Sequence, residues 1–263
     1  MNDINEINIQ AFRCEMRSIP SPKIKFDKAK LDNIDSLSPA EQADFAVFYY
    51  LGEGVKADRK KAVEIWKKAD TESAHLYLSA ELFRTKKLTD GFKMLQKAAN
   101  EGNKTAQLRF AYCLLMGIGT DINIDKAYKI FDKLAHEKIP CAVYFVGAIQ
   151  LMPNQNFITP NKERAQEKLM WSVKNGCKFA LFEQGAIQYS QAKNQTEKNE
   201  AYALIKKAAD QNEVRAMLYY AVSLARGEDI KQDLELAEKY LQRCIDLGFE
   251  PAIAAMKESI KKL

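Results

Sequence analysis

Histidine and cysteine are the residues whose types could support metal binding or nucleophilic catalysis in this chain, and both are scarce. The 263 residues include 2 histidines, His75 and His136, and 5 cysteines. Neither histidine lies four positions from another metal-ligand residue in a recognisable motif, so we expect no metal site. The cysteines form no CxxC pair and their number is odd, which favours reduced thiols buried in the core.

The motifs of common enzyme classes are also missing from the sequence. No GxxxxGK[ST], GxGxxG or GxSxG occurs, and the pairs Gly52/Gly54 and Gly117/Gly119 are explained as turns. Carboxylates on helices are usually solvated partners of lysine, and only Glu183 stands alone in an apolar helix. A Cys–His dyad assembled by folding is the open alternative. We therefore predict no enzymatic activity and no cofactor.

The composition is typical of a folded helical protein. Hydrophobic residues make up 47% of the chain, whereas Gly and Pro number only 11 and 7. The net charge of +5 is mild and spread along the chain, so it does not by itself indicate nucleic acid. The N-terminus lacks a basic and apolar leader, and no apolar run is long enough to cross a membrane. We therefore expect a cytoplasmic protein.

A repeat with a period of about 36 residues organises most of the chain. Each unit has two positions for small residues, and a large apolar residue follows the second position by four places. The first small column is Ala46, Ser79, Ala111, Gly147, Gly185 and Ala221, and the second is Ala62, Gly91, Ala127, Ala165, Ala201 and Ala237. The large residues are Trp66, Leu95, Phe131, Leu169, Ile205 and Leu241. Small residues let two helices approach, and the large residue fills the space between them.

These columns predict six helical hairpins between residues 39 and 250. Ser38 and Glu41 predict a capping box at the start of the first helix. The second helices should end at residue types that tolerate left-handed backbone. Those residues are Gly102, Gly176, Asn212 and Gly248.

Both ends of the chain lie outside the repeat. In residues 1–38, Pro20 and Pro22 break any helix, and we expect a partly ordered tail or a strap over the first hairpin. The alternative is a segment that occupies the binding groove or helps to grip a partner. Residues 251–263 are predicted to form a solvated capping helix.

The units resemble the Sel-like repeat (SLR) family, which is related to tetratricopeptide repeats. The resemblance lies in Gly52-Glu53-Gly54 followed by Lys61-Ala62, and in Gly117-Ile118-Gly119 followed by Lys126-Ala127. The second, fourth and fifth units lack this glycine turn. The resemblance implies an all-α fold, a right-handed α-solenoid with a concave groove, and binding or adaptor work. Secreted members of the family carry regular cysteine pairs. This chain has no such pairs, so the resemblance implies a cytoplasmic member.

The first helix of each hairpin is apolar or aromatic on nearly all sides, whereas the second has one apolar stripe and a lysine-rich back. First helices should therefore line the groove. Residues one, four and five places after the first small column, and three places before it, should face it. Aromatic residues and arginine are the usual anchors of protein interfaces. This register selects Tyr50, Phe83, Arg84, Tyr112, Met116, Tyr144, Phe182, Tyr189 and Arg226. The alternative is that these residues fill the core between adjacent repeats.

The sequence as a whole favours a non-enzymatic scaffold that binds a partner protein through this groove. From the resemblance alone, we expect a bacterial immunity protein that neutralises a secreted effector toxin, or an adaptor in a secretion or signalling complex. The second hypothesis is a helical-repeat binder of single-stranded RNA, which the repeat length and the basic net charge superficially suit. Such proteins read bases with polar inner side chains, and the inner helices here are apolar. Nucleic acid is therefore the weaker expectation.

Overall fold

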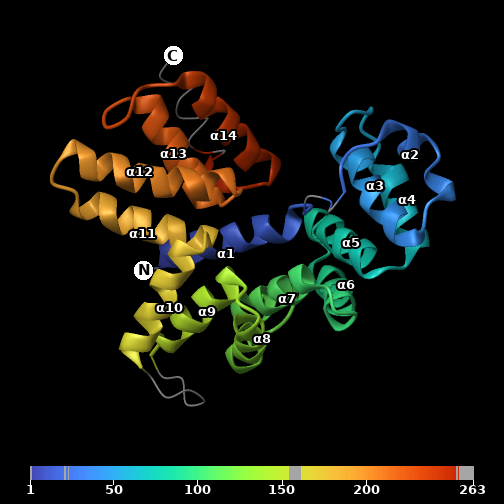
Figure 1. Ribbon diagram of the computed structural model, residues 1–263, viewed down its shortest axis with the longest axis horizontal. Coiled ribbons are helices and arrows are strands. Elements are labelled where there is room, and N and C mark those ends of the chain that lie inside the picture. Colours follow the sequence, from blue (N-terminus) through green and yellow to red (C-terminus); the bar gives the residue numbers. More distant parts are fainter. Residues whose placement is uncertain (1, 21, 23, 154–160, 253, 255–263) are drawn as a thin grey trace. The chain divides into compact units, whose positions relative to one another are not determined.

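The computed structural model of the protein describes residues 2–20, 22, 24–153, 161–252 and 254. Within these ranges the chain forms fourteen α-helices and one 3-10 helix, and no strand (Figure 1). The predicted all-α solenoid of helical hairpins is confirmed.

Three elements precede the six pairs of helices, and helices form on both sides of Pro20 and Pro22, so the expectation that these prolines break any helix in residues 1–38 is wrong. The first elements are α1 (Asn2–Arg17), α2 (Lys28–Asp32) and η1 (Ile34–Ser36). The first three pairs are α3 (Pro39–Leu51) with α4 (Arg59–Ala69), α5 (Glu72–Arg84) with α6 (Leu88–Asn100), and α7 (Lys104–Met116) with α8 (Ile124–His136). The last three are α9 (Pro140–Gln150) with α10 (Lys162–Lys174), α11 (Lys178–Gln191) with α12 (Gln195–Asp210), and α13 (Val214–Arg226) with α14 (Leu234–Asp246).

Local signals in the sequence set the helix ends. At α3, the Glu41 backbone N–H donates to Ser38 Oγ at 3.4 Å, and the Ser38 N–H donates to the Glu41 carboxylate at 3.2 Å. The four residues predicted to close second helices all have positive φ. The values are 101° at Gly102, 79° at Gly176, 61° at Asn212 and 73° at Gly248. The predicted capping box and left-handed closures are therefore confirmed.

The two small columns bring the helices of a hairpin into contact. A Cβ atom on Gly147 of α9 would lie 3.0 Å from the Ala165 carbonyl oxygen of α10. A Cβ atom on Gly185 of α11 would lie equally close, 3.0 Å, to the carbonyl oxygen of Ala201 in α12. Only small residues fit where backbones approach this closely. Of the large residues in the repeat, Trp66, Leu95, Phe131 and Ile205 are fully buried, whereas Leu169 and Leu241 are half-buried.

The chain forms two compact units, and the boundaries between them fall within α1 and α8. The N-terminal unit is Met16–Ala127, and the C-terminal unit is Met1–Glu15 with Tyr128–Leu263. In the N-terminal unit, Leu31 and Ile34 pack against Phe45 and Phe48 of α3, so the segment before the repeats covers the first hairpin.

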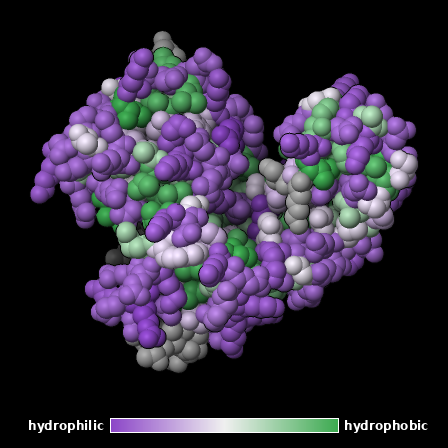
Figure 2. Space-filling model, in the orientation of Figure 1, coloured by the Kyte–Doolittle hydropathy of each residue, from purple (hydrophilic) through white to green (hydrophobic). Residues whose placement is uncertain are grey.

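The C-terminal unit contains α9 to α14 and most of α1. The predicted capping helix at 251–263 lies, apart from residues 251, 252 and 254, outside the described residues. On the face of each unit that Figure 2 shows, the surface is mainly hydrophilic, with apolar patches between polar side chains.

Candidate protein-binding surface

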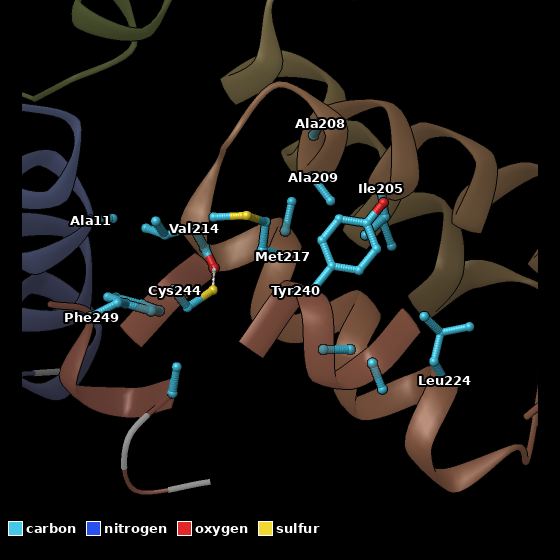
Figure 3. Packing of buried hydrophobic residues seen from close by; sticks show 14 of the residues in the cluster. Ala11, Ile205, Ala208, Ala209, Val214, Met217, Leu224, Tyr240, Cys244 and Phe249 are labelled. Atoms are coloured by element: carbon cyan, nitrogen blue, oxygen red, sulfur yellow. Dashed lines mark hydrogen bonds between the residues drawn. The ribbon is translucent and has the colours of Figure 1, made fainter. Parts of the chain in front are cut away.

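Helix α1 packs against the first helices of the last three hairpins. The Phe12 side chain is 5% exposed, and its ring centre lies 5.8 Å from that of Phe145 in α9 and 5.3 Å from that of Phe179 in α11. Ala11 belongs to the buried cluster that includes Val214 and Phe249, and it points toward them (Figure 3). We call the surface of α9, α11 and α13 that contacts α1 the inner face.

Polar contacts flank these apolar ones. The Arg215 guanidinium donates to Asn8 Oδ1 at 2.8 Å, and Lys178 Nζ donates to the Glu15 carboxylate at 2.5 Å. The Lys178 and Glu15 side chains are 15% and 16% exposed, so the ion pair is shielded from solvent. Helix α1 is therefore docked by an apolar seam with a polar contact toward each end.

A pocket of about 330 Å³ lies beside α1 on the inner face. Its aromatic walls come from three tyrosines of successive helices and from Phe249, and Ile7 of α1 forms part of its edge. The tyrosines are Tyr189 of α11, Tyr202 of α12 and Tyr219 of α13. The ring centres of Tyr189 and Tyr219 are 5.9 Å apart, and those of Tyr189 and Tyr202 are 5.2 Å apart. A concave, largely apolar surface with a few polar groups is typical of binding sites.

The Asp229 carboxylate at the pocket already has hydrogen-bond partners. The Asp229 carboxylate accepts hydrogen bonds from Lys198 Nζ, at 2.6 Å, and from the Tyr189 hydroxyl. These bonds lower the pKa of Asp229, and the bond to Asp229 raises the pKa of Tyr189. Asp229 thereby fixes the orientation of the Tyr189 ring in the pocket wall.

The Arg215 guanidinium is held by Glu213, which caps the start of α13, and by the ring of Phe182. Its Nε donates to the Glu213 carboxylate at 2.7 Å, and its guanidinium lies 5.0 Å from the ring centre of Phe182. Burial alone would lower the pKa of Arg215, but the charge of Glu213 and this hydrogen bond outweigh it, and the pKa is raised. Arg226 and Glu228, which also line the pocket, are exposed at its rim and accessible to a ligand.

The residues selected from the sequence have three kinds of environment. Tyr50, Phe83, Tyr112 and Tyr144 are at most 6% exposed and fill the core. Met116, Phe182 and Tyr189 are half-buried, and Arg84 and Arg226 are exposed. The structure brings Tyr189 and Arg226 together in the pocket, and Phe182 packs edge-on against Tyr219 nearby, with ring centres 6.5 Å apart.

The buried residues bridge neighbouring hairpins. Tyr50 is the clearest case, because its hydroxyl donates to Glu81 of α5 at 2.7 Å and its ring lies 5.2 Å from that of Trp66. Burial, with the Glu81 contact, raises the pKa of Tyr50 to about 12. Such residues hold neighbouring hairpins together and expose little side-chain area to a ligand.

Sequence reasoning missed Tyr202, Arg215 and Tyr219 as pocket residues. Leu218 and Val222 line the pocket and occupy the same register positions, three before and one after Ala221, that were expected to face the groove. Tyr219 was not selected because it lies one position away from that register. Tyr202 was not selected because it belongs to the second helix of its hairpin, and only first helices were expected to line the groove. The pair Tyr219-Tyr220 beside the selected positions was the available signal.

The described part of the chain holds no group of three or more His, Cys, Asp or Glu side chains placed to bind a metal ion. Within the same residues, no helix combines the length and apolar character that crossing a bilayer requires.

Two solved structures are similar in fold. One is a Sel1 repeat protein from Oxalobacter formigenes, with 21% identity, a TM-score of 0.54, and coverage of 81% of this chain and 89% of that one. The other is a protective antigen present in uropathogenic Escherichia coli strains that displays an SLR fold, with 20% identity and a TM-score of 0.50. That match covers 88% of this chain and 50% of the other, so this chain spans half the length of the E. coli protein. A comparison with curated proteins found no match.

A family profile described as the Sel1 repeat matches residues 42–69, 84–103, 105–137, 182–213 and 214–249. These ranges cover more than half of the chain and fall in five of the six hairpins, leaving out α9 and α10. Proteins of this family commonly serve as protein-interaction scaffolds and are typically non-enzymatic. Together with the stacked hairpins and their small-residue columns, the match establishes that the chain belongs to the Sel1 repeat family.

Proposed function

We propose that this protein is a non-enzymatic scaffold that binds a partner protein on the inner face of its C-terminal unit. The observation that carries the proposal is the pocket beside α1, where the half-buried Tyr189 and Tyr219 meet the exposed Arg226. Tyrosine and arginine supply much of the binding energy in protein interfaces, because they combine large apolar area with hydrogen-bonding groups. The family's common use as a scaffold supports the same role.

The matched pair Tyr219 and Tyr220 provides the test. Both side chains are half-buried and pack against the same core cluster, but Tyr219 lines the pocket whereas Tyr220 packs edge-on against Tyr240 with ring centres 5.6 Å apart. A partner would be captured with the full chain, purified, and titrated against both alanine variants. We expect Tyr219→Ala to weaken binding at least about tenfold, as truncation of an interface anchor does, and Tyr220→Ala to leave it within about twofold.

A second pocket variant separates charge from packing. Arg226→Glu reverses an exposed charge at the rim and removes no buried contact, so the fold should be unaffected. A purified partner whose affinity is unchanged by both Tyr219→Ala and Arg226→Glu would refute the proposed site. Steeply salt-dependent binding of single-stranded RNA, without a protein partner, would refute the proposed function itself.

Within this role, the expected partner is a toxic effector neutralised in the bacterial cytoplasm, or a component of a secretion or signalling complex. Support comes from the family resemblance, and from the five cysteine thiols, four of them buried, which suit a reducing compartment. Co-expression with the product of a neighbouring reading frame tests the two uses. Rescue of growth from a toxic product indicates immunity, whereas a stable complex with two different proteins indicates an adaptor.

A further inference from the structure

The side of α1 that faces the repeats has the pattern of a helical ligand. Asn8, Ala11, Phe12 and Glu15 stand at i, i+3, i+4 and i+7, which places them on one side of the helix. Ala11 and Phe12 are 6% and 5% exposed, and Cys14 beside them is 1% exposed. An aromatic anchor between small residues, with a polar contact toward each end, is how an amphipathic helix binds a receptor surface.

The inner face supplies a matching group for each position. Phe145 and Phe179 contact Phe12, and Val214 shares a buried cluster with Ala11. Lys178 pairs with the Glu15 carboxylate, and Arg215 donates to Asn8 while its charge is already offset by Glu213. The inner face therefore accepts one carboxylate, opposite Lys178, and a neutral hydrogen-bond acceptor opposite Arg215.

The docking of α1 is incomplete in its hydrogen bonding. Gln10 Oε1 and Arg13 Nε are buried without a hydrogen-bond partner among the described residues. Polar atoms desolvated in this way weaken docking, because water would satisfy them in the released helix. At the N-terminal end of the contact, Ile7 is 39% exposed and borders the tyrosine pocket, so the surface under α1 continues into the proposed binding site.

We infer that α1 is a built-in occupant of a helix-binding surface, and that an amphipathic helix of the partner binds by displacing it. The partner helix has an aromatic residue with small residues one place before it and two places after it, and a carboxylate three places after it. This inference rests on the proposed function, since it names the partner's chemistry and the regulation of the same face. Because α1 is tethered to the inner face, its effective concentration there is high, and ligands of low affinity do not displace it.

The first test uses a fluorescein-labelled peptide of residues 2–17, with Cys14 replaced by Ala to prevent oxidation, and full-length protein. In Phe12→Glu protein the native α1 no longer docks, and we expect the peptide to bind at least tenfold more tightly than to wild type. The matched control is Ile187→Glu, which places the same charge on a residue of α11 that is 50% exposed, and it should behave as wild type. Equal binding to wild type and Phe12→Glu protein overturns the inference.

A charge exchange protects the test against loss of folding in Phe12→Glu. We expect Lys178→Glu protein to bind a peptide carrying Glu15→Lys and to reject the unmodified peptide, with the reverse preference in Glu15→Lys protein. Absence of this preference also overturns the inference. A wild-type dimer that Phe12→Glu converts to monomer would assign the displacing helix to a second copy and overturn the partner assignment. Because the peptide assay needs no partner, its failure is distinct from failure of the Tyr219→Ala test of the proposed function.

Discussion

At the scale of single residues, Trp66 shows how one large side chain organises a hairpin. It is fully buried, its Nε1 donates to the Ala43 carbonyl oxygen at 2.9 Å, and its ring lies between those of Tyr50 and Tyr77, at 5.2 and 5.3 Å. Tyr77 in turn donates to Asp44 at 2.7 Å. One residue of α4 thus ties together α3 and the first helix of the next hairpin.

Trp66→Ala should lower the free energy of unfolding of the N-terminal unit by about 3 to 5 kcal/mol, because it leaves a large cavity and an unpaired carbonyl group. Trp66→Phe keeps most of the ring volume and loses the N–H donor, so its cost should be smaller. Urea denaturation followed by circular dichroism measures both. Equal losses for the two variants would mean that packing of the ring contributes little.

The carboxylate of Asp229 gives the pocket a pH dependence whose direction follows from its partners. Lys198 and Tyr189 hold the pKa of Asp229 below its ordinary value of 3.8. The ionised group therefore contributes stability above pH of about 4, and this contribution is lost as pH falls through the lowered pKa. Asp229→Asn should be less stable than wild type at pH 7, and the difference should shrink toward pH of about 3.

The control for this comparison is Glu228→Gln, which removes a carboxylate from the neighbouring exposed position at the same pocket rim. Its stability should match that of wild type throughout this pH range. Thermal unfolding of the three proteins at pH 7, 5 and 3 gives the result. A deficit of Asp229→Asn that is constant across this range would show that the carboxylate's charge is not what stabilises the pocket wall.

At the scale of elements, the glycine turns of the hairpins serve two different purposes. Gly102 has a φ of 101°, and a Cβ atom there would meet nothing within 4 Å, so only its backbone conformation requires glycine. Gly119 has a φ of 73°, and a Cβ atom there would lie 2.3 Å from the carbonyl oxygen of Leu88 in α6. The second glycine of this turn therefore also lets two hairpins approach.

Gly102→Ala should cost about 1 to 2 kcal/mol, which is the strain of left-handed backbone in a residue with a Cβ atom. Gly119→Ala should cost clearly more, because the added atom collides with backbone that no rotamer change can move away. Chemical denaturation of the two variants decides the order. A Gly119→Ala protein as stable as Gly102→Ala would contradict the close approach of Leu88 to the turn.

At the scale of the whole molecule, stability in a repeat protein comes mainly from contacts between neighbouring hairpins. The two compact units, Met16–Ala127 and Met1–Glu15 with Tyr128–Leu263, each hold their own buried clusters. A local loss of packing should consequently remain local. This behaviour differs from that of a globular domain with one shared core, which unfolds as a single cooperative unit.

Trp66→Ala should therefore speed amide hydrogen exchange in α3 to α6 and leave the protection of α11 to α14 unchanged. Exchange followed by mass spectrometry of peptic fragments measures this directly. Loss of protection in α13 and α14 to the same extent would show that the chain unfolds in one step and that the two units are not independently stable.

The sequence by itself determined the repeat, the helix ends and the pairing of helices, because each depends on residues close together in the chain. Ser38 with Glu41, Gly176 and the small columns specify local backbone or contacts within one hairpin. The pattern of Gly52-Glu53-Gly54 was likewise sufficient to indicate the Sel1 repeat family, which a profile then matched.

Only the tertiary structure decided what the inner face contacts. Around Ala221 some positions of the register line the pocket, yet the register could not tell that Tyr50 and Tyr144 are covered by neighbouring hairpins. Nor could it choose, for the residues before Pro20, between a partly ordered tail or strap and a segment that occupies the groove, because Phe12 meets Phe145 and Phe179 across more than 130 residues of chain. Periodicity reports which residues share a side of a helix, whereas the identity of the surface that covers that side depends on contacts between distant segments.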